Sequence, residues 1–123
     1  MYRQILVPLD GSELAEQVLP YVNLLGRRLR SSVKLVGVVL PVPATVNVGL
    51  NPTFYRDTSS AYEISRSDNY LSRLSGRLQI DGIDATFETL EGNPCTEIVS
   101  LAEDDPDTLI AMSTPGRSGV PAS

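Results

Sequence analysis

The segment RQILVPLDGSELAEQVLPYV (residues 3–22) combines a short apolar run, a turn and the start of an amphipathic helix. The apolar run ends at Asp-Gly-Ser (residues 10–12), which is the pattern of a buried strand followed by a turn. Ser12 is a favoured helix-capping residue, and two glutamates follow it where the helix dipole stabilises negative charge. Because apolar residues continue at helical spacing to Leu29, we expect one helix here, kinked at Pro20.

The rest of the chain repeats this alternation of strand and helix. Apolar runs at 33–40, 85–90 and 108–112 predict three further strands. Helical patterns cover residues 64–80 and 94–105, and a long loop is expected from 41 to about 59. Alternating strands and helices predict an α/β fold, in which a parallel sheet has right-handed crossovers and helices on both faces. At 123 residues the chain is expected to form a single domain.

Composition excludes several classes of function. The chain has no histidine and one cysteine, so within it a Ser-His-Asp triad, a histidine-containing zinc site and a disulfide are all impossible. With 10 basic and 15 acidic residues the net charge is −5, which argues against non-specific nucleic-acid binding. No signal peptide is evident, and prolines interrupt the uncharged stretch 35–55, so we expect a cytoplasmic protein that has no membrane span.

Ligands of such sheets bind beyond the carboxyl ends of the strands, where the strand order reverses. Two segments fall there: the turn at Asp10, and the loop Ser-Thr-Pro-Gly-Arg-Ser-Gly at 113–119, whose small residues can turn N–H groups toward an anion. The loop lacks the lysine of a P-loop, and GxGxxG is also absent. Asp10 has a plainer interpretation as a turn-forming residue beside Gly11.

The chain resembles the universal stress protein family. Residues 3–22, quoted above, are similar to that family's first strand and helix. The segment EGNPCTEIVSLAEDDPDTLIAMSTPGRSG (91–119) is similar to its third helix, fourth strand and glycine loop. The resemblance implies a Rossmann-like, doubly wound three-layer α/β/α domain over 1–123. It also implies that ATP or another adenine nucleotide, with or without Mg²⁺, binds across the strand ends.

The resemblance assigns roles to individual residues. Asp10 would accept hydrogen bonds from the ribose hydroxyls or the adenine amino group, Pro8 and Leu9 would contribute backbone, and Val38 would pack on the adenine. The phosphate loop would begin with Met112, Ser113 and Gly116, and Arg117 and Ser118 would be further donors. The resemblance implies no metal-ligating or catalytic side chain.

Two departures from the family pattern keep other functions open. Ser113 stands where the glycine motif has its first glycine, and the motif's Gly-Ser pair would fall beyond Ser123. The resemblance therefore implies a domain without its last helix and fifth strand. Because that strand commonly carries the family's dimer contact, the resemblance also implies a homodimer when the protein is intact. The leading hypothesis is a cytoplasmic stress-response protein that binds the nucleotide as a sensor or switch. The alternatives are a nucleotide-free homodimeric interaction module and weak Mg²⁺-dependent ATP hydrolysis.

Overall fold

The computed structural model describes residues 2–40 and 52–113. The described strands form one parallel sheet in the order β3-β2-β1-β4. The strands are β1 (Gln4–Pro8), β2 (Ser32–Val39), β3 (Ala85–Glu91) and β4 (Thr108–Ile110). The helices are α1 (Glu13–Glu16), α2 (Leu19–Leu29), α3 (Pro52–Ile80) and α4 (Pro94–Glu103). The predicted α/β fold with a parallel sheet is therefore confirmed.

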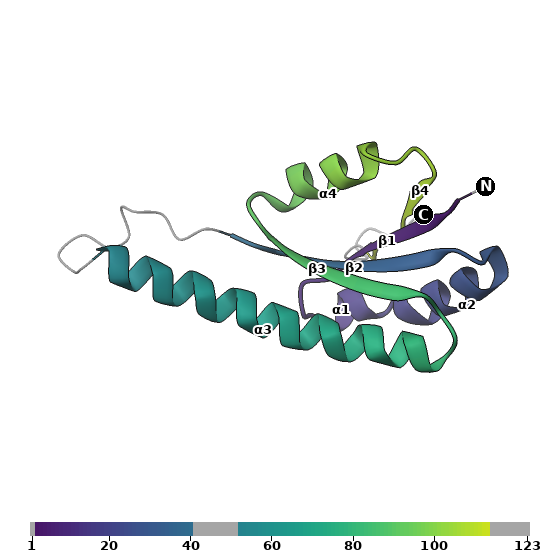
Figure 1. Ribbon diagram of the computed structural model, residues 1–123, viewed down its shortest axis with the longest axis horizontal. Coiled ribbons are helices and arrows are strands. Elements are labelled where there is room, and N and C mark those ends of the chain that lie inside the picture. The colour runs from purple at the N-terminus through teal and green to yellow at the C-terminus, as the bar shows by residue number, and fades with distance from the viewer. Residues whose placement is uncertain (1, 41–51, 114–123) are drawn as a thin grey trace.

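Helices cover both faces of the sheet, as a three-layer arrangement requires. In Figure 1, α4 lies on one side of the strands, and α1, α2 and α3 lie on the other. The main core forms between the sheet and α2 and α3, where the central strands contribute fully buried side chains. Leu6 and Val36 are buried on the opposite face of the sheet. Because both faces of β1 and β2 are covered, most residues of these strands are apolar, although β2 includes Lys34.

The helix after β1 differs from the expected single kinked helix. The chain forms a short α1, leaves it at Gln17 and begins α2 at Leu19. Pro20 therefore occupies the first turn of α2, where its missing N–H needs no partner. Residue Arg30 closes α2 in the left-handed conformation with φ of 55°.

Two other boundaries were predicted wrongly. The loop expected to reach about residue 59 is shorter, because α3 already begins at Pro52. The fourth strand, expected over 108–112, ends at Ile110. The backbone of Ala111 still donates to the Leu6 carbonyl at 2.9 Å, so the chain remains beside β1 for one residue more. No helix in the described part of the chain has both the length and the apolar character needed to cross a membrane.

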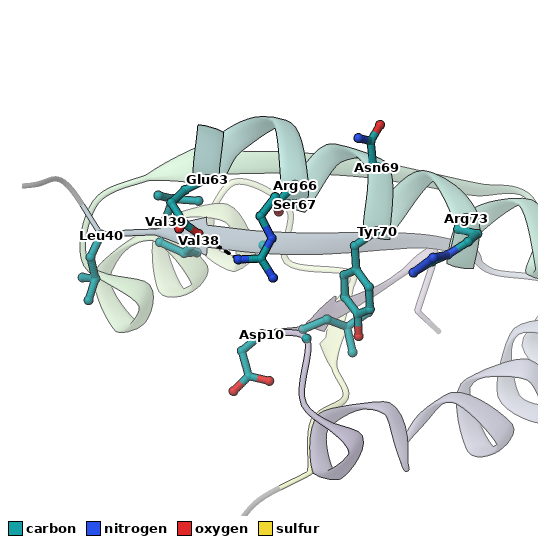
Figure 2. A pocket seen from close by; sticks show the side chains of 13 residues that line it. Asp10, Val38, Val39, Leu40, Glu63, Arg66, Ser67, Asn69, Tyr70 and Arg73 are labelled. Atoms are coloured by element: carbon teal, nitrogen blue, oxygen red, sulfur yellow. Dashed lines mark ion pairs between the residues drawn. The ribbon is translucent and has the colours of Figure 1, made fainter. Parts of the chain in front are cut away.

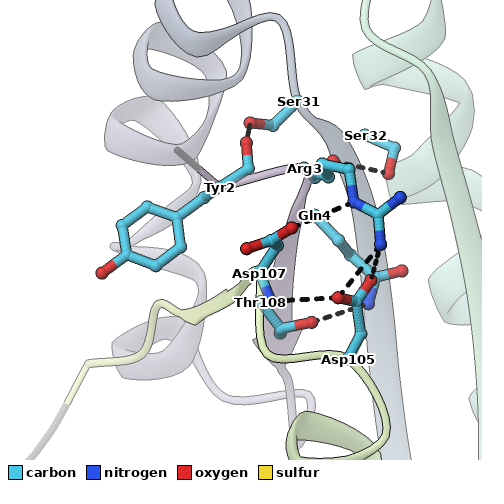
Figure 3. A network of polar contacts seen from close by, with 8 residues as sticks. All are labelled: Tyr2, Arg3, Gln4, Ser31, Ser32, Asp105, Asp107 and Thr108. Carbon is cyan, nitrogen blue, oxygen red and sulfur yellow. Dashed lines mark hydrogen bonds and ion pairs between the residues drawn. The ribbon is translucent and has the colours of Figure 1, made fainter.

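A polar network joins the strands at the amino end of the sheet (Figure 3). The Arg3 guanidinium donates to both carboxylate oxygens of Asp105 at 3.2 Å, and its Nε lies 3.4 Å from Asp107. The backbone N–H of Arg3 donates to the Asp107 carbonyl at 2.9 Å. A hydrogen bond from the Asp107 N–H and the nearby Arg3 charge lower the pKa of Asp105. This network connects the start of β1 to the segment before β4, at the end of the sheet opposite to the carboxyl ends of the strands.

Candidate functional site

A cavity of about 670 Å³ lies at the carboxyl ends of β1 and β2, beside α3. Its size falls in the range typical of small-molecule sites. Strand-end residues form one side of it, and side chains from α3 form the other (Figure 2). The lining residues are Leu9, Asp10, Gly11, Gly37, Val38, Val39, Leu40, Glu63, Arg66, Ser67, Asn69, Tyr70 and Arg73.

Asp10 is held as a carboxylate at the rim of this cavity. Its Oδ1 accepts a hydrogen bond of 2.9 Å from the backbone N–H of Ser12, while the Ser12 hydroxyl accepts from Ala15 N–H and caps α1. Hydrogen bonds from the side chain and the backbone of Ser12 lower the pKa of Asp10. The carboxylate is therefore a fixed hydrogen-bond acceptor at neutral pH, exposed to anything that enters the cavity.

The strand β2 approaches α3 closely at Gly37. A Cβ built on Gly37 would lie 2.5 Å from Ser67 Oγ and 3.3 Å from Leu71 Cδ1. The Ser67 hydroxyl is itself hydrogen-bonded to Thr89 Oγ1 at 2.9 Å, which joins α3 to β3. The absence of a side chain at Gly37 thus allows the helix to pack against the strand beside the cavity.

The α3 wall carries most of the charge of the cavity. Arg66 extends from α3 toward the end of β2, and Arg73 lies further along the same helix (Figure 2). Glu63 lies 3.9 Å from Arg66, one turn earlier. Together with Asp10, these side chains give the lining two guanidinium groups and two carboxylates.

Tyr70 connects the cavity to α1. Its hydroxyl donates a 2.5 Å hydrogen bond to Glu16 Oε2, and its ring lines the cavity between α3 and Asp10. Burial of the hydroxyl and the bond to Glu16 raise the pKa of Tyr70, and the negative charges of Glu16 and Asp10 add to the effect. The neutral phenol is therefore the form that the folded protein stabilises.

The raised pKa of Tyr70 predicts that the protein loses stability at alkaline pH. Because the pKa of Tyr70 is higher folded than unfolded, the unfolded chain releases its phenol proton first, near pH 10. The free energy of unfolding is expected to fall as the pH rises above about 10. In Tyr70→Phe this decline should be smaller, as measured by urea unfolding between about pH 8 and 11. Tyr21→Phe, at a ring that is 68% exposed, is the matched control and should retain the wild-type decline.

The structure brings some of the residues implied by the resemblance together and leaves others apart. Leu9, Asp10 and Val38 all line the cavity. Pro8 is the last residue of β1 and directly precedes Leu9. Met112 and Ser113 follow β4 and do not line the cavity, and Met112 is 52% exposed. Gly116, Arg117 and Ser118 lie outside the described residues.

The cavity residues of α3 were not among the site residues predicted from the sequence. Arg66 and Arg73 are seven residues apart, which places them on one face of a helix. That spacing was the available signal, but nothing in the sequence indicates that this face looks toward the strand ends. The ring of Tyr70, on the same helix, also lines the cavity.

Metal-binding geometry is not evident in the described residues. Within 2–40 and 52–113, no three Cys, Asp or Glu side chains are grouped so as to hold a metal ion. The acidic residues after α4 serve the sheet instead, since Asp105 and Asp107 pair with Arg3.

A cavity at the strand ends of a parallel sheet, lined by a carboxylate and apolar side chains, lies where α/β domains commonly bind small ligands. A family model described as "Universal stress protein family" matches residues 1–122, so this chain belongs to the universal stress protein family. Over 120 residues it is 27% identical to the universal stress protein MJ0531 of Methanocaldococcus jannaschii, an alignment that covers 98% of this chain and 69% of that protein.

Solved structures share the fold. The protein MJ0577 matches with a TM-score of 0.79 at 24% identity, over 98% of this chain and 80% of that one. A universal stress protein crystallised in complex with cAMP matches with a TM-score of 0.59 at 16% identity, over 90% of this chain and 75% of the other. The recognised family and the Rossmann-like architecture are therefore confirmed.

Proposed function

We propose that this chain is a cytoplasmic stress-response protein that binds an adenine nucleotide, ATP or a close relative, in the cavity between β1, β2 and α3. The observation that carries the proposal is Asp10, an ionised acceptor fixed by Ser12 at the rim of a cavity of nucleotide size. A structural relative that is known in complex with cAMP supports the same class of ligand.

The residues present fit the adenosine part of such a ligand. Leu9, Val38, Val39 and Leu40 supply apolar surface at the ends of β1 and β2, suited to a purine ring. The Asp10 carboxylate accepts hydrogen bonds from the ribose hydroxyls or the adenine amino group. The two arginines and two carboxylates of the lining give it no net formal charge, which suits a neutral, planar base.

In this proposal the phosphates lie toward the loop that follows β4. Ser113 offers a hydroxyl donor, and Gly116, Arg117 and Ser118 follow in the same loop. Mg²⁺, when it accompanies ATP, offsets the charge of the phosphates. The protein holds its ligand and reports its presence, and we assign no catalytic residue.

Calorimetric titration with ATP tests the proposal, and saturable binding by the wild-type protein is the expected result. Asp10→Asn should weaken binding by about tenfold or more, because it replaces a charged acceptor. The matched control is Asp84→Asn, which removes the same charge from an exposed residue outside the cavity, just before β3. Wild-type protein that shows no saturable binding at millimolar ATP would contradict the proposal, and so would equal affinities of the two variants.

A second candidate function is a nucleotide-free homodimeric interaction module. It is favoured by Ser113 in place of the motif glycine and by apolar side chains near the β4 edge, where Ile110 is 37% and Met112 is 52% exposed. The same titration separates the two candidates, because the interaction module binds no nucleotide.

A further inference from the structure

We propose that Arg66 is a binding residue for the base, and that its guanidinium group stacks on the adenine ring at the end of β2. This inference rests on the proposed function and names a contact that the strand-end residues alone do not provide. It assigns to α3 one wall of the base subsite, opposite the apolar surface of Val38 and Val39.

The position of Arg66 is the first argument. Its side chain extends from α3 into the space between the end of β2 and Asp10 (Figure 2). These are the elements that would hold the base and the ribose. The Arg66 side chain is 65% exposed, so its guanidinium is accessible to a ligand in the cavity.

The surroundings of Arg66 are the second argument. Its Cζ lies 5.8 Å from the centroid of the Tyr62 ring, a residue that is not part of the cavity lining. The guanidinium is therefore already placed against one aromatic ring. A planar cation has two faces, and a purine entering the cavity can cover the one that Tyr62 leaves open.

The charge of the cavity favours a base over a phosphate at this point. Glu63 lies 3.9 Å from Arg66 and partly neutralises it, and the ionised Asp10 lines the same cavity. A phosphate brought to Arg66 would be repelled by both carboxylates. A neutral aromatic base meets no such repulsion, and it gains contact with the guanidinium plane and with the apolar strand end.

Arg73 is less suited to this role. Its Cζ lies 6.0 Å from the centroid of the Tyr70 ring, and the Tyr70 hydroxyl is in turn bound to Glu16. Tyr70 lies between Arg73 and the end of β2 in Figure 2. Arg66 is therefore the guanidinium nearer to the proposed base subsite.

The test compares adenosine, AMP and ATP as titrants of the wild-type protein, Arg66→Lys and Arg66→Ala. Lysine keeps the positive charge and loses the planar group, so it separates stacking from simple charge attraction. We expect Arg66→Lys to weaken all three ligands by the same factor, about fivefold, and Arg66→Ala by at least as much. The control Arg77→Ala, on α3 but outside the cavity lining, should change affinity by less than about twofold.

Each other outcome overturns the inference. Losses confined to AMP and ATP would show that Arg66 contacts phosphate. Unchanged affinities in both Arg66 variants, with binding weakened by Asp10→Asn, would overturn this inference and leave the proposed function standing. If wild-type protein binds none of the three ligands, both fail. Thermal unfolding checks that each variant is folded. If Arg66→Ala does not fold, the affinities of Arg66→Lys alone decide the test.

Discussion

Leu71→Ala is expected to lower the free energy of unfolding by about 2–5 kcal/mol. Leu71 is fully buried on the face of α3 that packs against the sheet, and it belongs to the main core cluster. Truncation removes apolar contacts and leaves a cavity that the two rigid elements around it close only in part. Urea unfolding monitored by circular dichroism measures the loss.

The matched control for Leu71 lies on the same helix. Ile80 is 85% exposed at the end of α3, so Ile80→Ala should change the free energy of unfolding by about 0.5 kcal/mol or less. Similar losses in the two variants would show that α3 does not pack on the sheet through the face that Leu71 defines.

Gly37→Val is expected to lower the free energy of unfolding by about 3 kcal/mol, and Gly37→Ala by a smaller amount. The added Cβ would lie 2.5 Å from Ser67 Oγ and 3.3 Å from Leu71 Cδ1. Ser67 must then rotate away from Thr89, and the buried Leu71 has little space to move. Valine adds two more methyl groups in the same confined space.

Two further variants test this explanation. Ser67→Ala introduced into Gly37→Ala should recover part of the lost stability, because it removes the atom that the new Cβ meets. Gly76→Ala, on α3 with nothing within 4 Å of the built Cβ, should instead stabilise the protein by about 0.5–1 kcal/mol. A Gly37→Ala variant as stable as wild type would refute the close approach of β2 and α3.

The sequence predicts the order of elements well, because buried parallel strands leave a strong signal. Residues 5–7 are apolar throughout, residues 33–36 are apolar except for Lys34, and the turn at residues 10–12 marks where β1 ends. That end also places Asp10 at the site. A proline near a helix start is harder to interpret, since the same Pro20 fits a kink and a first turn equally well in sequence.

The α3 wall of the cavity could not be predicted in the same way. Residues 61–70 read AYEISRSDNY, in which polar residues lie on nearly every side of the helix. Without an apolar stripe, the face that points toward the strands is set by packing further along, where Leu71, Leu74 and Leu78 are buried. Arg66 reaches the cavity because of that distant packing, a tertiary effect that local pattern does not record.

The cavity and the amino-end network differ in how far apart in the sequence their residues lie. Among the residues that the structure describes, those that line the cavity lie between Leu9 and Arg73, whereas Arg3 meets its partner Asp105 across a separation of 102 residues. Contacts between residues that are close in sequence form at a lower entropic cost than contacts between distant residues. In addition, a chain is synthesised from its amino end. During synthesis these described lining residues are thus available before β3, α4 and β4 exist, whereas the contact between Arg3 and Asp105 must wait for the chain beyond α4.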